Sequence, residues 1–311
     1  MESAIEIKDL KKYFEDIKAV DGITFNISKN EIFGLVGPDG AGKTTTIRML
    51  CGLVQPDSGN AYILGYDLKK QKKYIKREIG YLSQKFSLYT DLTVDENIEF
   101  FADIHGVKKF HERRNELLEF TRLTAFRHFL AGKLSGGMKQ KLALACTLIH
   151  KPQIIFLDEP TTGVDPVSRR DFWKILSDLL DEGITILIST PYLDEAERFD
   201  RLAMLNNGQV LKFDTPENIK KSLHKQIAEI ITPNIRESYT ILKENTSFEI
   251  QIFGDRLDAA LDNFENDITI IKELLHKHNI EITDCRTKPA SLENVFIHLL
   301  KNENSNTINV I

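Results

Sequence analysis

Residues 37–44, with the sequence GPDGAGKT, have the composition and spacing of a phosphate-binding loop. They match the pattern G-x-x-x-x-G-K-[ST] between an apolar strand and a predicted helix. Glycines let such a loop wrap closely around phosphates, and the helix N-terminus adds positive potential. The alternative, a glycine-rich turn without a ligand, does not account for this context. The sequence therefore predicts a nucleotide site formed by Gly37, Pro38, Asp39, Gly40, Ala41, Gly42, Lys43, Thr44 and Thr45. In that site Lys43 would contact the β- and γ-phosphates, and the Thr44 hydroxyl would ligate Mg²⁺.

A second group of reactive side chains ends the apolar run at residues 154–157. Asp158 would hold Mg²⁺, usually through water, and the adjacent Glu159 would orient and deprotonate an attacking water. On its own, an acidic pair at the end of a strand is more often a helix cap or a solvated turn. Its significance depends on the motif that precedes it.

That motif is LSGGMKQ at residues 134–140, which stands before a predicted helix. Alone, it is most simply a loop and a helix cap. Together with the phosphate loop and the acidic strand, it resembles the LSGGQ signature of the ABC ATPases, with Met138 at the place of the usual first glutamine. The resemblance implies that ATP and Mg²⁺ bind, and that two subunits, identical or different, face each other head to tail. Residues Ser135, Gly136 and Gly137 of one subunit would then reach the γ-phosphate bound by the other.

Further positions acquire roles only through this resemblance. Gln84 matches the glutamine that touches Mg²⁺ and links the nucleotide to a membrane partner, so it is a metal-binding and catalytic candidate. Phe14, or with less support Tyr13, stands where the family has an adenine-stacking aromatic, although a core aromatic is the competing interpretation. Asp165 matches the D-loop aspartate but is also a plain helix cap. Residues 86–97 correspond to the segment on which a permease's coupling helix docks.

One position departs from the family pattern. After the apolar run at residues 184–188 the chain reads STPYLDEA, and Pro191 stands where the family usually has a switch histidine. Proline offers neither an imidazole nor an amide donor to a γ-phosphate. Thr190 or Tyr192 could substitute, hydrolysis could be slow, or a partner subunit could supply the competent site.

The elements that must position these residues follow from periodicity. Short apolar runs at residues 32–36, 79–82, 154–157 and 184–188 alternate with helix-period segments, which predicts a largely parallel sheet covered on both faces. Helices are expected at residues 135–149 and 166–183, and Asn-Asn-Gly at 206–208 predicts a hairpin. The resemblance implies an α/β P-loop ABC ATPase fold with a parallel core sheet, an antiparallel β subdomain and a helical subdomain at about 88–150.

The chain is expected to contain two domains. The ATP-binding domain would span residues 1–225, and a small α/β accessory domain would span residues 226–311. In the latter, strands are expected at 248–253 and 280–282, and helices at 256–276 and 292–300. Residues 289–296, PASLENVF, further resemble the closing helix of the ATPase subunits of drug- and polysaccharide-exporting ABC transporters. A packing helix is the alternative.

Composition limits the function classes. The 311 residues are 41% hydrophobic and 28% charged with a net charge of -5, which is typical of a soluble globular protein and gives no general attraction to nucleic acid. The three cysteines form no metal-binding pattern, and no apolar run approaches the ~20 residues of a membrane-spanning helix. Any membrane role is therefore expected to be peripheral, and the resemblance to ABC ATPases implies a cytoplasmic location on the inner face of the cell membrane.

The leading hypothesis is an ATP hydrolase that powers export through a separate multi-span permease. A hydrolysis-deficient ATP-sensing partner is the alternative that Pro191 raises. An ABC protein acting on ribosomes or DNA is disfavoured, because the chain has one phosphate loop and no sustained heptads. A GTPase is disfavoured because the chain lacks the guanine-reading Asn-Lys-x-Asp element.

Overall fold

The computed structural model describes residues 2–85 and 88–308, and the chain divides into two compact units, Met1–Thr215 and Pro216–Ile311. The division lies ten residues before the boundary expected from the sequence. Helix α8 (Pro216–Lys221) accounts for the difference, because it contacts α11 (Leu292–Ile308) of the second unit.

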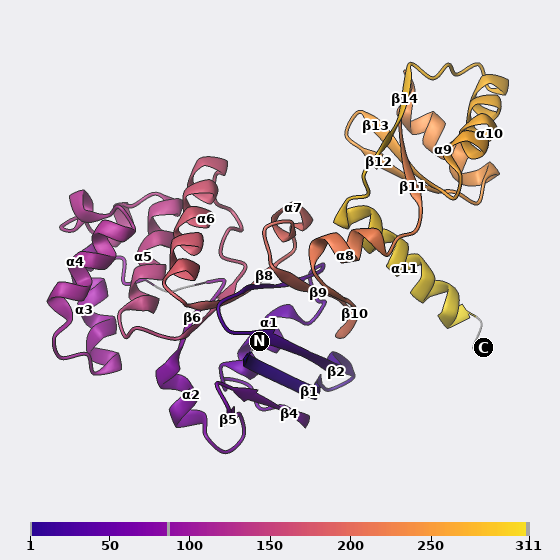
Figure 1. The fold of residues 1–311 in the computed structure, drawn as a ribbon. Coiled ribbons are helices and arrows are strands. Elements are labelled where there is room, and N and C mark those ends of the chain that lie inside the picture. The colour runs from indigo at the N-terminus through magenta and orange to yellow at the C-terminus, as the bar shows by residue number, and fades with distance from the viewer. Residues whose placement is uncertain (1, 86–87, 309–311) are drawn as a thin grey trace. The chain divides into compact units, whose positions relative to one another are not determined.

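A six-stranded sheet forms the centre of the first unit, in the order β10-β9-β3-β8-β7-β6 (Figure 1). All its neighbours pair in parallel except β9 and β10, which form the hairpin predicted at Asn207 and Gly208. Strands β3, β7 and β8 are buried along their whole length, as expected for parallel strands with both faces covered. The strands are β3 (Ile32–Val36), β6 (Ile79–Leu82), β7 (Ile154–Asp158), β8 (Thr185–Thr190), β9 (Arg201–Asn206) and β10 (Gln209–Asp214).

A second sheet of the first unit is antiparallel, in the order β2-β1-β4-β5. Its strands are β1 (Ser3–Phe14), β2 (Ile17–Ser28), β4 (Ser58–Ile63) and β5 (Tyr66–Asp67). One buried cluster joins this sheet, helix α1 (Lys43–Leu50) and the six-stranded sheet; it includes Ile7, Ile27, Leu35, Ile47 and Phe156. The phosphate loop between β3 and α1 is thus anchored at both ends in a continuous core.

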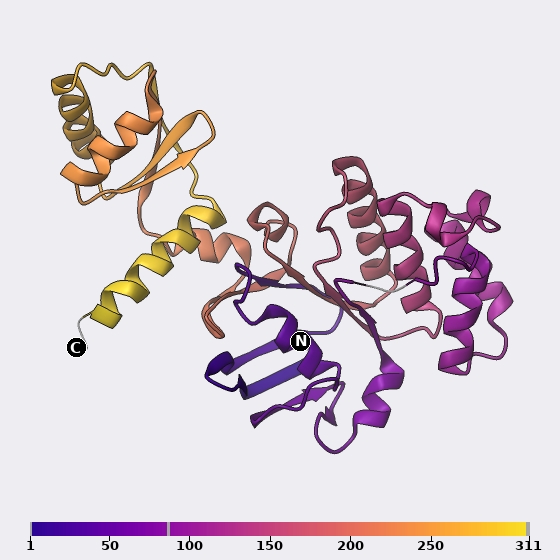
Figure 2. The ribbon, with the colours of Figure 1, turned by 180° about the vertical axis from the view of Figure 1, so that it is seen from behind.

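The remaining helices of the first unit are α2 (Lys72–Glu78), α3 (Val94–His105), α4 (Phe110–Phe120), α5 (Gly136–Leu148), α6 (Pro166–Asp181) and α7 (Leu193–Ala196), with short 3-10 turns at Thr124–Phe126 and Ala131–Lys133. A capping box between Thr93 and Glu96 begins α3, and Asp165 caps α6 ahead of Pro166. Helices α3 and α4 lie at the opposite end of this unit from β1, β2 and β4, as both ribbon views show (Figures 1 and 2).

The second unit contains an antiparallel sheet in the order β12-β13-β11-β14. Helices α9 (Ile235–Asn245) and α10 (Phe264–Lys277) share an apolar core with it that includes Ile230, Leu242, Leu257, Ala259 and Ile271. Because side chains alternate along a strand, Glu229 and Asp258 belong to the other face of the sheet. The strands are β11 (Gln226–Ile231), β12 (Glu249–Phe253), β13 (Arg256–Leu261) and β14 (Asp284–Lys288).

Two expectations for this unit are wrong. Residues 256–261 form strand β13 rather than the start of a helix, because their backbone pairs with β11 and β12 and every second side chain, at Leu257, Ala259 and Leu261, lies in the apolar core. The strand expected at 280–282 lies instead at Asp284–Lys288, where the backbone pairs with β11.

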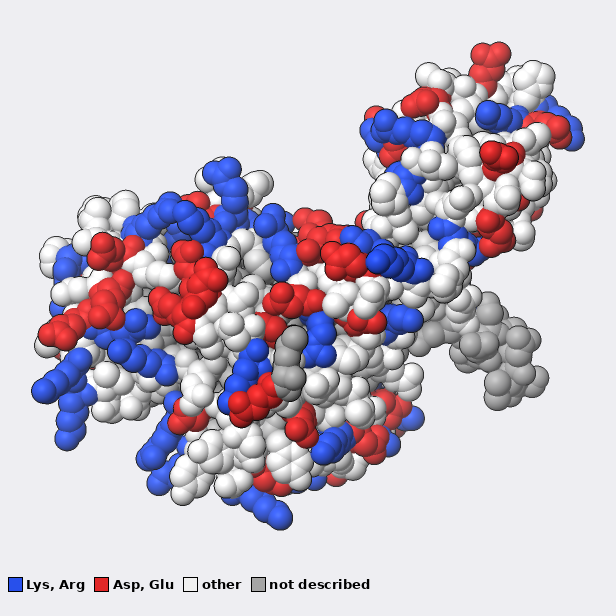
Figure 3. Space-filling view, in the orientation of Figure 1, with Lys and Arg blue, Asp and Glu red and all other residues white. Residues whose placement is uncertain are grey.

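On the face drawn in Figure 3, acidic and basic side chains are interspersed over the described residues.

Candidate nucleotide site

The loop between β3 and α1 is held in a conformation that only glycine accommodates at two points. Gly42 has a φ of 101°, and a Cβ atom there would lie 2.4 Å from the carbonyl oxygen of Ala19. A Cβ on Gly37 would lie 2.2 Å from the carbonyl oxygen of Leu205. The predicted need for glycine in this loop therefore comes from close backbone approach as well as from backbone angles.

Lys43, the first residue of α1, is almost fully buried and folds back over its own loop. Its Nζ donates hydrogen bonds to the carbonyl oxygens of Gly37, at 2.8 Å, and Pro38, at 3.0 Å. The same atom lies 3.5 Å from Oε1 of Glu159. A single buried ammonium group thus stands between the phosphate loop and the acidic end of β7.

Asp158 is fully buried at the end of β7 and is a potential metal ligand. Its Oδ1 accepts hydrogen bonds from the hydroxyls of Thr44, at 2.9 Å, and Ser189, at 2.7 Å. Its Oδ2 is buried without a hydrogen-bond partner among the described residues. A buried carboxylate oxygen without a partner beside a threonine hydroxyl suits a hard cation with oxygen ligands. Ser189 was not predicted as a site residue; it lies opposite Asp158 on the neighbouring strand β8, and its position at the end of the apolar run at residues 184–188 is the signal that the sequence offers.

Glu159 is held between several partners. Its Oε2 accepts a hydrogen bond from Nε2 of Gln84 at 2.9 Å and lies 3.5 Å from the Thr162 hydroxyl. Its backbone N–H bonds the Ser189 hydroxyl at 3.0 Å, and its φ of 50° is uncommon for a residue with a side chain. The backbone therefore turns at Glu159, and the carboxylate meets Lys43 and Gln84 together.

These side chains border a cavity of about 620 Å³. Seven of its lining residues were predicted from the phosphate loop, and Gln84 and Glu159 were predicted as catalytic candidates. The sequence also placed Pro191 at the position of the switch histidine and named Tyr192 as a substitute for it, and both border the cavity. The lining residues that were not predicted are Ile17, Ala19 and Thr162. The full lining comprises Ile17, Ala19, Asp39, Gly40, Ala41, Gly42, Lys43, Thr44, Thr45, Gln84, Glu159, Thr162, Pro191 and Tyr192. Three predicted residues, Gly37, Pro38 and Asp158, do not border the cavity. They form hydrogen bonds to the lining residues Lys43 and Thr44.

Phe14 is the last residue of β1 and is outside the lining. Its side chain is 47% exposed, and Nζ of Lys12 lies 5.2 Å from the centre of its ring. Ile17, which pairs with Phe14 across the hairpin and is 69% exposed, does border the cavity. The stacking role of Phe14 stays a prediction, with Ile17 as the apolar side chain next to the loop.

The signature residues lie outside the cavity. Ser135 caps α5 by accepting a hydrogen bond from the Met138 N–H, and both Ser135 and Gly136 are exposed. Gly137 is buried against α6, where a Cβ atom would lie 2.3 Å from the Ser168 hydroxyl. Glycine at this position therefore permits the close packing of α5 on α6. Of the segment expected to meet a permease, Phe86 and Ser87 lie outside the described residues.

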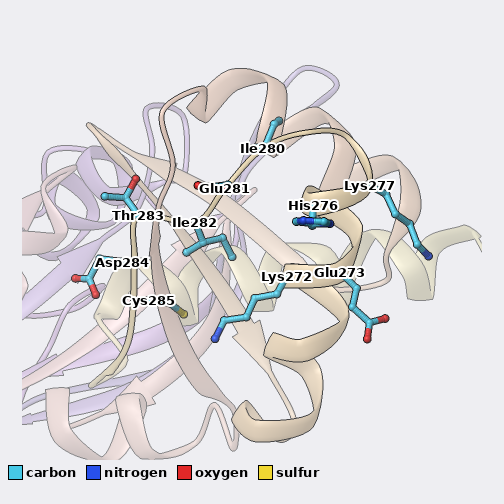
Figure 4. A pocket seen from close by; sticks show the side chains of 10 residues that line it. All are labelled: Lys272, Glu273, His276, Lys277, Ile280, Glu281, Ile282, Thr283, Asp284 and Cys285. Carbon is cyan, nitrogen blue, oxygen red and sulfur yellow. The ribbon is translucent and has the colours of Figure 1, made fainter.

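Two further cavities contain titratable groups. In the second unit, one of about 720 Å³ is lined by α10 and the segment leading into β14, with Lys272, His276 and Cys285 among its side chains (Figure 4). In the first unit, a smaller one of about 270 Å³ is bordered by His105 and His150, whose rings stack at 3.9 Å. Partial desolvation of its ring, which stacks on His150, and the charge of that neighbour lower the pKa of His105 to about 4, while the rest of the side chain stays exposed. Neither cavity shares a lining residue with the nucleotide site.

No helix among the described residues has the length and apolar content needed to cross a bilayer. The family model described as ABC transporter matches residues 20–162. The chain is 43% identical over 221 residues to the probable multidrug ABC transporter ATP-binding protein YbhF of Escherichia coli (strain K12), a match that covers 70% of this chain and 38% of that protein. It is 34% identical over 304 residues to the daunorubicin/doxorubicin resistance ATP-binding protein DrrA of Streptomyces peucetius, covering 95% of this chain and 92% of the relative.

Among solved structures, the dimeric post-hydrolysis state of the ATP-binding cassette MJ0796 bound to ADP and Pi superposes with a TM-score of 0.62 at 27% identity. That match covers 68% of this chain and 98% of the other. The α/β P-loop ABC ATPase fold predicted from the sequence is confirmed by this likeness and by the sheet order of the first unit. With the phosphate loop, the acidic strand and a relative matched over nearly its whole length, the chain belongs to the ATP-binding proteins of ABC transporters.

Proposed function

We propose that this chain binds and hydrolyses Mg·ATP, and that it powers export of a substrate through a separate multi-span permease. The observation that carries the proposal is the convergence of Lys43, Thr44, Gln84 and Glu159 at one cavity, with Asp158 hydrogen-bonded to Thr44 next to it. A cation, a hydroxyl, an amide and two carboxylates are the groups that phosphoryl transfer to water requires.

A magnesium ion fits the residues present. Thr44 and Asp158 would hold it, with Gln84 as a third ligand, because all three offer the hard oxygen atoms that Mg²⁺ prefers. The unpartnered Oδ2 of buried Asp158 supports this assignment. When bound, the ion would neutralise charge on the β- and γ-phosphates.

Glu159 is the proposed general base. Gln84 fixes one carboxylate oxygen at 2.9 Å, and Lys43 lies 3.5 Å from the other. A carboxylate oriented in this way can accept a proton from water, while Lys43 withdraws charge from the transferring phosphoryl group.

A dimer is the proposed working form. Ser135 and Gly136 are exposed at the start of α5 and lie outside the lining of their own chain's cavity. A helix N-terminus with a serine hydroxyl is well suited to bind an anion supplied by a second subunit. The related cassette MJ0796 was solved as a dimer, which supports the same arrangement here.

The proposed task is export, and the proposed location is the cytoplasmic face of the membrane. DrrA, matched along 92% of its length, is named for resistance to daunorubicin and doxorubicin, and YbhF is named as a probable multidrug transporter component. The separate permease would form the translocation path.

The proposal is tested by steady-state ATP turnover of the purified chain beside Glu159→Gln. Removal of a general base typically costs about 10² to 10⁴ in rate, so turnover is expected to fall at least about 100-fold while ATP binding is retained. Glu182→Gln, at an exposed glutamate at the C-terminus of α6, is the matched control and is expected to keep full turnover.

A second candidate function has one observation in its favour. Pro191 borders the cavity and offers no hydrogen-bond donor, which suits an ATP-sensing subunit that does not hydrolyse. Equal turnover of the unaltered chain and Glu159→Gln, with ATP bound by both, would support the sensor and contradict the hydrolase.

A further inference from the structure

The cavity wall formed by Pro191 and Tyr192 contains one hydroxyl that is free to bind a ligand. Thr190, which precedes Pro191, is engaged: its Oγ1 donates to Oε2 of Glu195 at 2.8 Å and accepts the Tyr192 N–H at 3.1 Å. Its side chain is also fully buried. Thr190 therefore organises this turn and has no donor left for a phosphate.

Tyr192 differs from Thr190 in both respects. It borders the cavity together with Lys43, Gln84 and Glu159, and its hydroxyl forms no hydrogen bond with any residue that the structure describes. A phenolic hydroxyl is a good donor to an anionic oxygen. Tyr192 can thus supply the hydrogen bond that a proline at position 191 cannot.

The orientation of the Tyr192 ring is fixed by a charged network. The guanidinium carbon of Arg169, on α6, lies 5.0 Å from the centre of the ring, within the range of a cation–π contact. Nε of Arg169 lies 3.6 Å from Oε1 of Glu195, whose side chain is 2% exposed. Glu195 therefore connects Arg169 with Thr190. Arg169 in turn contacts the Tyr192 ring, and Thr190 binds the Tyr192 backbone N–H.

We propose that the Tyr192 hydroxyl donates a hydrogen bond to the terminal phosphate of ATP, and that Arg169 is a positioning residue that orients the Tyr192 ring. This inference rests on the proposed nucleotide site but not on hydrolysis, because the contact exists as soon as ATP is bound. It predicts that Tyr192 contributes to the preference for ATP over ADP, which lacks the terminal phosphate.

The test is equilibrium binding of ATP and of ADP, each with Mg²⁺, to chains that carry Glu159→Gln so that ATP persists. A hydrogen bond to a charged group corresponds to a change of about 10- to 100-fold in affinity. Tyr192→Phe keeps the ring on Arg169 and removes only the hydroxyl, so it is expected to lower the ATP-to-ADP affinity ratio at least about tenfold with ADP affinity unchanged. A ratio that changes less than about twofold would overturn the inference.

A matched control and a rescue complete the test. Tyr62→Phe removes a hydroxyl from another tyrosine with a cation over its ring, Lys8 at 5.5 Å, outside the cavity, and is expected to leave the ratio unchanged. Adding Pro191→His to Tyr192→Phe supplies an imidazole next to the lost hydroxyl and is expected to restore most of the ratio. Recovery of less than about a third of the lost ATP-to-ADP affinity ratio would contradict the view that a histidine at position 191 and the Tyr192 hydroxyl donate to the same phosphate.

The role of Arg169 is read from the same ratio. Arg169→Met removes the cation over the ring and is expected to weaken ATP binding selectively, whereas Arg169→Lys is expected to recover part of it. Equal losses for ATP and ADP would show a structural role and overturn the positioning assignment. Turnover is a separate readout, so a chain that lacks ATPase activity but shows the lowered ratio in Tyr192→Phe refutes the hydrolase while keeping the tyrosine contact.

Discussion

Replacement of Asn294 by alanine is expected to destabilise the second unit. Asn294 lies at the start of α11, is 2% exposed, and belongs to the PASLENVF segment. Its Nδ2 donates to Oδ2 of Asp258 at 3.1 Å and to Oε1 of Gln251 at 3.2 Å. Its Oδ1 accepts from the N–H and the hydroxyl of Ser291. One side chain thus joins the first turn of α11 to β12 and β13.

The magnitude follows from the groups that lose a partner. A hydrogen bond to a charged carboxylate contributes about 1.5–3 kcal/mol, and one to a neutral amide about 0.5–1.5 kcal/mol. Asp258 keeps Lys288, whose Nζ lies 2.7 Å from Oδ1, so its charge stays paired in the variant. The expected loss in free energy of unfolding is therefore about 2–4 kcal/mol.

The assay is urea unfolding of the full chain followed by far-UV circular dichroism, with hydrogen exchange of peptides from β13 and α11. Tryptophan fluorescence is unsuitable because the chain's one tryptophan, Trp173, lies in α6 of the first unit. Faster exchange is expected in β13 and the first turn of α11, with protection of β3 and β7 unchanged.

Two further variants make the reasoning refutable. Asn302→Ala changes an exposed asparagine of the same helix and is expected to cost less than about 0.5 kcal/mol. Asn294→Asp replaces an amide donor with a second carboxylate beside buried Asp258. It is therefore expected to lower the free energy of unfolding at pH 7 by more than Asn294→Ala does. A loss below about 1 kcal/mol for Asn294→Ala would refute the assignment of Asn294 as the anchor of α11.

Two further predictions concern the first unit. Gly42→Ala is expected to cost at least about 1 kcal/mol more in thermal unfolding than Gly40→Ala, because a Cβ on Gly42 meets the Ala19 carbonyl whereas Gly40 has open space within 4 Å; equal costs would contradict this steric account. Because the pKa of His105 is about 4 in the folded chain and about 6.5 when unfolded, the unfolded state binds more protons between these values, and stability is expected to fall as pH drops from about 6.5 to 4. His105→Gln is expected to flatten this dependence of stability on pH, measured by urea midpoints between pH 7 and 4.5. The effect is expected to be small, because the His105 side chain is exposed. An unchanged slope in His105→Gln would exclude His105 as its source.

The parallel strands of the first unit could be predicted because each is a continuous apolar run, and both faces of such strands are buried. The strand β13 could not, because Asp258-Ala259-Ala260 has a weak local preference and only packing against α9 and α10 separates strand from helix. Tertiary contact, rather than local propensity, decides the structure of that segment.

Site residues divide in the same way. The phosphate-loop glycines with Lys43, and the acidic pair, could be recognised because each group occupies one short segment with the residue types and spacing that its chemistry needs. Tyr192 could be named from the sequence because it stands next to the position of the switch histidine. Ile17 and Ala19 border the cavity through the fold alone, since both belong to β2, whose place beside the phosphate loop depends on how the two sheets pack. The hydrogen bonds of Thr190 likewise become visible only when the side chain of Glu195 is placed.

The ion pair between Lys43 and Glu159 has a consequence for the timing of catalysis. Both groups are almost fully buried, and each is the counterion of the other at 3.5 Å. In the proposed mechanism, a terminal phosphate bound by Lys43 would compete for that ammonium group and loosen its ion pair with the carboxylate. Glu159 would then keep its hydrogen bonds to Gln84 and Thr162, so the contact that stabilises the resting protein would release this carboxylate only when ATP arrives.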